Sequence, residues 1–336
     1  MSPVDTHTGL RWTTVDQGHR DGLLDQGLKV AHRLGWGRMH RMSIAHVRKH
    51  LGPLPQPLRR LAYGPTVSVP VDNLQLPTRD GSVPARVYRG GIHPRAPLVV
   101  FLHGGGFVAG DLDSHDHVCR TLAVAANAVV VAIHYRRAPE HPYPAAVHDC
   151  ADAIVALADR AADLGVCLDR VCITGDSAGG NLSVAAALYL HDHQQGPKVA
   201  RLLLVYPASD ISMSGASMDS NAAGALLCAE DVRHFHHQYF TGVDTTEPPR
   251  YFSFIHAPTL AGLPPCSIAV AGRDPIRDDG VALAHKLVHD GVEVEVCEYP
   301  SAYHGYWLLP GVSHAARHTT AWFAERIRES RSTDAN

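Results

Sequence analysis

The sequence lacks the features that would place it across a membrane or on a nucleic acid. No apolar run approaches the roughly 18 residues that a membrane-spanning helix needs, and runs such as 98–102 end after a few residues. Neither sign of charge dominates, because 30 Lys and Arg residues stand against 33 Asp and Glu residues. A net charge of −3 argues against a strongly basic nucleic-acid binder.

Cysteine is scarce and irregularly spaced, which argues against a disulfide framework. The seven cysteines are an odd number and contain no CxxC pair. The first 18 residues include no apolar stretch of the kind that a secretory signal requires. We therefore expect reduced thiols and a cytoplasmic protein.

Histidine, by contrast, is abundant. The 24 histidines include close pairs and a cluster at 234–237, but none comes with a matching set of carboxylate or cysteine ligands. We therefore expect neither a metal nor an organic cofactor.

Short apolar runs alternate with longer amphipathic stretches from residue 98 onward. Their continuous apolar character is typical of strands that are buried on both faces. Strands are predicted at 67–78, 83–90, 98–102, 129–133, 171–174, 202–206, 267–271 and 292–299. Helices are predicted at about 115–126, 145–163, 180–192, 279–290 and 314–329. This alternation predicts an α/β architecture with a mostly parallel sheet and helices on both of its faces.

Two segments, 1–60 and 210–256, interrupt the alternation. The pattern of the first segment predicts two short helices, in which Leu24, Leu28 and Ala31 share a face. The second is too long for a simple crossover between strands. Both are expected to form a helical cap over one end of the sheet. The expected division is a first cap segment (1–60), core (61–209), a second cap segment (210–256) and core again (257–336).

The pentapeptide Gly-Asp-Ser-Ala-Gly at 175–179 follows a predicted strand and opens a predicted helix. G-x-S-x-G in this context is typical of a serine nucleophile raised above a sheet, since small neighbours let strand and helix approach closely. The alternative is an ordinary loop whose serine caps the helix. We interpret Ser177 as the nucleophile.

A second glycine-rich motif, His-Gly-Gly-Gly at 103–106, follows the strand predicted at 98–102. Glycines leave backbone N–H groups free to turn outward, as an oxyanion hole requires. A flexible loop is one alternative, and a phosphate-binding loop is another, although no GK[ST] or GxGxxG follows. We expect Gly104, Gly105 and Ala178 to donate to the oxyanion.

A serine nucleophile needs a base and an acid that orients the base. Asp274 is the first carboxylate beyond the strand at 267–271, at the strand end where parallel sheets bind ligands. Asp278 and Asp279 are better placed as acids at a helix N-terminus. His304 follows the last predicted strand, and the order Ser, Asp, His suits a catalytic triad.

Together the motifs resemble the hormone-sensitive lipase family of α/β-hydrolases. The resemblance implies an eight-stranded, mostly parallel sheet and a cap built from N-terminal helices plus an insertion. It maps the family's nucleophile, acid and base onto Ser177, Asp274 and His304. The chain departs from the usual family pattern at Arg137, in place of Leu, and at Tyr306, in place of Phe. The stretches that carry the resemblance are HGGGF (103–107), YRRAPEHPYPAA (135–146), GDSAGGN (175–181), YP (206–207), GLPPC with RDPIRDDG (262–280) and YHGY (303–306).

We therefore expect a serine carboxylesterase that hydrolyses short- to medium-chain acyl esters through an acyl-enzyme. Phe107 and Tyr306 are candidate pocket residues. The expected partner is a small acyl ester, with no nucleic acid, no stable membrane insertion and a homodimer as one option. The sequence leaves two alternatives open. The same triad could serve deacetylation, lactone or amide hydrolysis or natural-product tailoring, or the fold could be a non-catalytic small-molecule receptor.

Overall fold

The computed structural model describes residues 9–15, 27, 38–91 and 95–330. Within these residues the strands form one nine-stranded sheet in the order β1-β9-β8-β7-β6-β4-β5-β3-β2. Only β3 runs against the other strands, since it pairs antiparallel with both β2 and β5. The strands are β1 (Leu10–Thr14), β2 (Val71–Thr78), β3 (Gly81–Arg89), β4 (Ala96–Leu102), β5 (Val129–Ile133), β6 (Val166–Asp176), β7 (Val199–Val205), β8 (Cys266–Arg273) and β9 (Val294–Tyr303).

The sheet contains every strand predicted from the sequence and one more. The prediction for the first segment, two short helices, did not include β1, which pairs in parallel with β9. Leu10 and Trp12 pack against the core, while Arg11 on the other side reaches Glu295 at 3.3 Å. The edge of β9 thus stabilises a strand too short to be recognised alone. The predicted helical face of Leu24, Leu28 and Ala31 lies outside the described residues.

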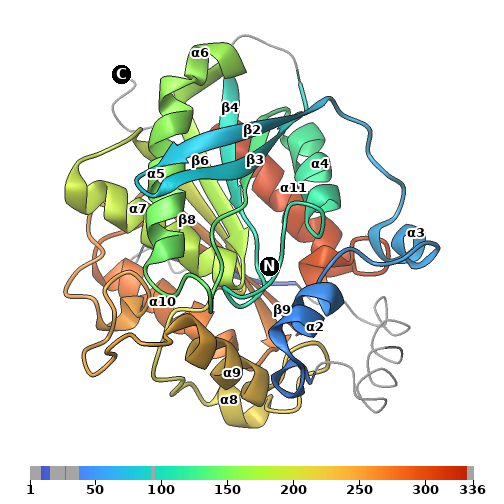
Figure 1. Ribbon diagram of the computed structural model, residues 1–336, viewed down its shortest axis with the longest axis vertical. Helices are drawn as coiled ribbons and strands as arrows, with labels where there is room; N and C mark the ends of the chain where they lie inside the picture. The colour runs from blue at the N-terminus through green and yellow to red at the C-terminus, as the bar shows by residue number, and fades with distance from the viewer. Residues whose placement is uncertain (1–8, 16–26, 28–37, 92–94, 331–336) are drawn as a thin grey trace.

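Helices cover both faces of the sheet, as predicted (Figure 1). One face carries α4 (Asp116–Ala126) and α11 (His314–Glu329), and the other carries α5 (Ala145–Asp159), α7 (Ala178–His193) and α10 (Arg277–His289). The helix predicted at 145–163 is interrupted, because α6 (Ala161–Leu164) starts anew after Arg160. The η4 turn (Tyr306–Leu308) precedes α11.

The central strands show why the sequence folds into three layers. In β4, Leu98, Val100 and Leu102 face the core under one helical layer. Val99 and Phe101 alternate with them and face the core under the other layer. All five side chains are fully buried, so the continuous apolar run supplies both cores at once.

The remaining helical elements come from the two predicted cap segments. The first segment supplies η2 (Met39–Arg41), α2 (Ile44–His50) and α3 (Leu58–Tyr63), and the second supplies α8 (Ser217–Ser220), α9 (Ala229–Tyr239) and η3 (Phe254–His256). In Figure 1 α8 and α9 lie at the bottom of the view and α2 and α3 at its right-hand side. Arg48 of α2 is bonded through both terminal nitrogens to Glu140, which holds this segment against the loop after β5. None of the described helices has the length and apolar character to cross a membrane.

Candidate active site

Ser177 occupies a sharp turn between β6 and α7. Its backbone has φ 55° and ψ −121°, a region that residues with a side chain rarely adopt. Its N–H donates to the carbonyl of Val205 at 2.9 Å, which fixes the turn to the neighbouring strand. A Cβ at Gly179 would lie 1.9 Å from the carbonyl oxygen of Leu102, so only glycine lets the helix approach the sheet here. The turn lifts the serine hydroxyl above the strand ends.

Ser177, His304 and Asp274 form one chain of hydrogen bonds. His304 Nε2 lies 2.9 Å from Ser177 Oγ, and His304 Nδ1 lies 2.7 Å from Asp274 Oδ2. The ring of Tyr206 packs on the imidazole, with ring centroids 4.5 Å apart. The sequence prediction thus selected three residues that the fold brings within hydrogen-bonding distance. Such an arrangement lets a serine hydroxyl lose its proton to the imidazole.

The carboxylate of Asp274 is fully buried and held in one orientation. Its Oδ1 accepts the N–H of Ile276 at 2.9 Å, which leaves Oδ2 to face the imidazole. Since a buried carboxylate needs partners for both oxygens, this geometry keeps the proton of His304 on Nδ1.

Two other carboxylates nearby have different partners. Asp278 and Asp279 lie in the first turn of α10, as the sequence predicted. Asp278 Oδ2 accepts the N–H of Ser217 at 2.9 Å, and Asp279 Oδ2 accepts the N–H of Ser209 at 2.8 Å. Burial raises the pKa of Asp279 to about 7. These acids hold the chain that leaves β7, and neither contacts His304.

The His-Gly-Gly-Gly loop requires a correction to the predicted oxyanion donors. The N–H of Gly104 donates to Asp176 Oδ1 at 3.0 Å, so it is already committed. Within the described part of the chain, the N–H groups of Gly105, Gly106 and Ala178 donate to no protein acceptor. The available donors are therefore the second and third glycines of the motif together with Ala178.

Gly106 has no room for a side chain. Its φ is +62°, and a Cβ there would lie 2.4 Å from Cγ of Phe235 on α9. The next residue, Phe107, stacks on Tyr239 of the same helix, with ring centroids 3.9 Å apart and an interplanar angle of 7°. Helix α9 therefore supports the His-Gly-Gly-Gly loop directly.

A cavity of about 660 Å³ opens at Ser177 and His304. Both cap segments contribute to its walls, the first through residues that include Met39 and the second through residues that include Val232. Leucines that are scattered in the cap sequence gather here, namely Leu51, Leu54, Leu58, Leu61, Leu226 and Leu227. The cavity wall is accordingly mostly apolar, although His50 and His236 also line it.

The two predicted pocket residues have different positions. Phe107 lines the cavity and is almost fully buried. The prediction for Tyr306 is wrong, because its ring packs in the core between Tyr206 and Tyr299. Its hydroxyl lies 2.8 Å from Oγ1 of Thr319 on α11. The chain turns at Gly305 (φ +81°), and the following residue packs under the sheet rather than in the cavity.

The sequence predicts that Asp176, beside the nucleophile, fixes hydrogen bonds of the loop rather than acting as a base, and its bond to the N–H of Gly104 agrees with that role. Asp176 also lies 3.1 Å from Nε2 of His115, which is buried on α4's N-terminal side and bonded to Ser114. The sequence also predicts that Phe235 lies on an apolar helix face of the second cap segment. It does not predict the contact of Phe235 with Gly106, because that contact spans more than a hundred residues.

Comparisons with known proteins agree with this geometry. A family model described as the alpha/beta hydrolase fold matches residues 99–308. Esterase LipI of Mycobacterium tuberculosis is 40% identical over 281 residues, which are 83% of this chain and 86% of that protein. The chain belongs to the hormone-sensitive lipase family of α/β-hydrolases.

Other members of this lipase family extend the comparison. Ethyl acetate hydrolase of Pseudomonas putida is 32% identical over 263 residues, which are 77% of this chain and 82% of that protein. The solved structure of a hyperthermophilic esterase from the archaeon Pyrobaculum calidifontis is 34% identical, with a TM-score of 0.82. It covers 91% of this chain and 97% of its own. The chain is therefore an ester hydrolase.

Proposed function

We propose that this member of the hormone-sensitive lipase family is a serine carboxylesterase that cleaves short- to medium-chain acyl esters through an acyl-enzyme. The observation that carries the proposal is the hydrogen-bonded chain from Ser177 through His304 to Asp274, with Ser177 and His304 at the wall of an apolar cavity. Hydrogen-bonded nucleophile, base and orienting acid are the groups that acyl transfer needs.

In the first step, Ser177 Oγ attacks the ester carbonyl carbon while its proton passes to Nε2 of His304. The 2.9 Å separation of these two atoms supports direct transfer. Asp274 keeps the opposite ring nitrogen protonated and stabilises the imidazolium that forms. The carbon–oxygen bond to the alcohol then breaks, and His304 returns the proton to the departing alcohol.

The negative charge on the carbonyl oxygen needs donors that are fixed in advance. Gly105, Gly106 and Ala178 are the donors that we assign, because their N–H groups have no protein acceptor in the described residues and all three line the cavity. Gly104 instead anchors the loop, since its N–H is bonded to the buried carboxylate of Asp176.

The second step removes the acyl group from Ser177. Water gives a proton to His304 Nε2 and attacks the acyl carbon, and the bond to Ser177 Oγ breaks as the serine recovers its proton. The products are a carboxylic acid and the free enzyme. The apolar walls exclude other water, which strengthens the oxyanion hydrogen bonds.

The range of acyl chains follows from an enclosed site rather than a flat apolar surface. A cavity of about 660 Å³ is within the usual range for sites that enclose small molecules. Two relatives have names that refer to small acyl groups, ethyl acetate hydrolase and acetyl-hydrolase. These points support esters up to about octanoyl as the preferred substrates.

We also assign the protein to the cytoplasm, where its seven unpaired cysteines would stay reduced.

Replacement of the nucleophile tests the proposal. Ser177→Ala should lower kcat for p-nitrophenyl butyrate by about 10⁴- to 10⁶-fold while the protein stays folded. The folded state is checked by circular dichroism. A folded variant that keeps more than about a tenth of the wild-type activity would show that Ser177 is not the nucleophile.

A further inference from the structure

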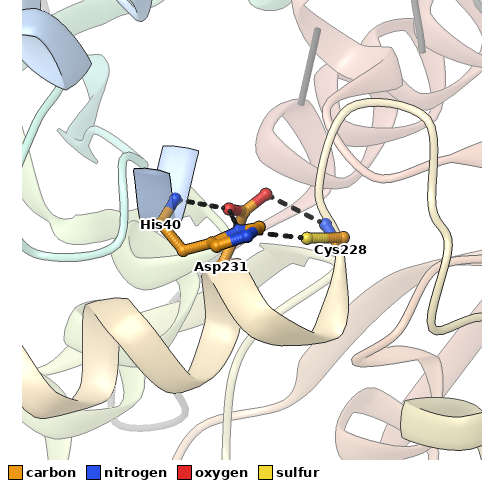
Figure 2. Close-up of side chains that lie close together, drawn as sticks. All are labelled: His40, Cys228 and Asp231. Atoms are coloured by element: carbon orange, nitrogen blue, oxygen red, sulfur yellow. Dashed lines mark hydrogen bonds and ion pairs between the residues drawn. The ribbon is translucent and has the colours of Figure 1, made fainter. Parts of the chain in front are cut away.

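Three side chains form a largely buried cluster where the two cap segments meet (Figure 2). His40 belongs to η2, and Cys228 and Asp231 belong to the N-terminal end of α9. Asp231 Oδ1 accepts both the backbone N–H and the Nδ1–H of His40, each at 2.8 Å. Asp231 Oδ2 accepts the N–H of Cys228 at 3.2 Å. We call these three residues, His40, Asp231 and Cys228 (the N-cap residue of α9), the cap clasp.

The contacts within the cap clasp are hydrogen bonds, although its side chains are also of the kinds that bind a metal ion. Imidazole, thiol and carboxylate are the kinds of ligand that Zn²⁺ accepts, and their donor atoms lie within 4.8 Å of one another. Arg41 Nε–H, however, donates to Nε2 of His40 at 3.2 Å, so the ring proton is on Nδ1. The Nδ1 proton is bonded to Asp231, so a metal ion could bind at this nitrogen only by displacing that proton.

The cap clasp and the loop at 103–107, which we call the oxyanion loop, contact the same face of α9. Asp231, Phe235 and Tyr239 are spaced by four residues, so their side chains follow one another along the helix. Asp231 contacts the first cap segment, Phe235 packs on Gly106 and Tyr239 stacks on Phe107. A shift of the helix at its N-terminal end is therefore passed to the glycines that we assign to the oxyanion hole.

Burial makes this contact costly to disturb. The side chain of Asp231 is fully buried and has no Arg or Lys partner among the described residues. Its charge depends on the three N–H donors from His40 and Cys228. Met39, next to His40, is buried and lines the cavity, so the first cap segment is fixed beside the substrate space.

We propose that His40 and Asp231 are positioning residues for the ester hydrolysis, which hold α9 so that Phe235 keeps the oxyanion loop in its active geometry. The inference rests on the proposed function. According to this inference, the contact between the two cap segments does more than close the cavity. It also affects how well the oxyanion hole stabilises the transition state.

The test compares Asp231→Asn with Asp244→Asn. Asparagine keeps the shape of the side chain, but its amide nitrogen cannot accept the N–H groups. The kcat for p-nitrophenyl butyrate should fall by about 10- to 100-fold, less than the loss of a whole oxyanion donor, with KM changed less than about threefold. Inactivation by diethyl p-nitrophenyl phosphate should slow in parallel, since its phosphoryl oxygen needs the same donors. Asp244 lies beyond α9 in the same cap segment, is exposed and accepts the N–H of Thr246 at 3.0 Å, so the same substitution made away from the cap clasp should match the wild type.

A second variant tests the route through Phe235. Phe235→Leu should also lower kcat, and the double variant Asp231→Asn/Phe235→Leu should lose no more than the larger single loss, because both changes displace one loop. If Asp231→Asn does not fold, His40→Ala replaces it, since this variant keeps the backbone donor and removes the ring.

Several results would overturn the inference. A folded Asp231→Asn variant with wild-type kcat and a lower melting temperature would show a purely structural role. Losses that multiply in the double variant would exclude a shared route through Phe235. A similar loss of kcat when the wild type is treated with EDTA would show a metal centre instead. An inactive wild type would overturn the proposed function as well, whereas an active wild type with an unaffected Asp231→Asn variant would overturn only this inference.

Discussion

Replacement of Asp274 by asparagine should disable the enzyme without unfolding it. The buried N–H of Ile276 needs an acceptor, so the amide oxygen of the new side chain should take the place of Oδ1. The amide NH₂ then faces Nδ1 of His304 at the position of Oδ2, 2.7 Å away in the wild type. Two donors cannot share a hydrogen bond, so the imidazole must move its proton to Nε2. In that tautomer the ring donates to Ser177 and cannot accept its proton.

The size of the loss follows from these contacts. The opposite amide orientation leaves the N–H of Ile276 buried without an acceptor, which costs about 1–3 kcal/mol. At most about one molecule in six would then hold the productive tautomer. The imidazolium formed in the transition state also loses the adjacent negative charge. Together these effects predict a fall in kcat of about 10⁴-fold, as expected when the acid of such a triad becomes an amide.

Steady-state hydrolysis of p-nitrophenyl butyrate measures this loss, and Asp278→Asn is the matched control. Asp278 is four residues away, and it bonds Ser217 and Arg277 rather than His304. Its variant should keep kcat within about threefold, since it changes a helix-terminal contact only. An active Asp274→Asn beside an inactive Asp278→Asn would refute the assignment of the acid.

Three further predictions concern the loop, the pH dependence of stability and the substrate. Gly106→Ala should lower kcat by about 10²- to 10³-fold in steady-state assays, because the new Cβ would displace Phe235 or the loop. An unchanged kcat would show that Gly106 does not belong to the oxyanion hole. Burial lowers the pKa of His117 from about 6.5 to about 4, so the unfolded chain binds a proton more readily than the folded protein. The free energy of unfolding is therefore highest above about pH 6.5 and falls by at most about 3 kcal/mol as the pH falls toward 4. Urea unfolding at several pH values should show this loss and a flatter profile for His117→Gln, and identical profiles would contradict it. Across p-nitrophenyl esters from acetyl to hexadecanoyl, kcat/KM should be highest at octanoyl or shorter, and a maximum at the longest chains would contradict the proposed substrate range.

The central sheet could be predicted because its strands carry their own signal. Runs such as 129–133 are apolar at every position, and burial on both faces requires that pattern. Strand β1 carries no such signal. Its five residues become a strand because β9 offers an unpaired edge, and the two partners are more than 280 residues apart in the chain.

The hydrogen-bonded set of Ser177, His304 and Asp274 could also be predicted, since position at strand ends and chain order both constrain it. Ser177, Asp274 and His304 each follow a strand that can be read from the sequence. The error at Gly104 arose because three consecutive glycines look alike in a sequence. Only the fold brings Asp176 close to Gly104. Because the N–H of Gly104 then donates to Asp176, it is no longer free to bind the oxyanion.

The cap was harder to predict, because its contacts join distant segments. His40 and Asp231 are 191 residues apart, and no local pattern links them. The leucines that line the cavity are scattered among basic residues and histidines in the cap sequence, so they form an apolar surface only after folding. Tyr306 illustrates the opposite error, since proximity to His304 in the chain does not place a side chain in the cavity.

The most direct test of the account is to trap the nucleophile covalently. Wild-type protein is treated with diethyl p-nitrophenyl phosphate, digested and examined by mass spectrometry. The account predicts one diethylphosphoryl group on the peptide that contains Ser177, loss of esterase activity in proportion to labelling, and no labelling of Ser177→Ala. Labelling of a different residue in step with the loss of activity, or a fully labelled Ser177 in an enzyme that still hydrolyses esters, would contradict it.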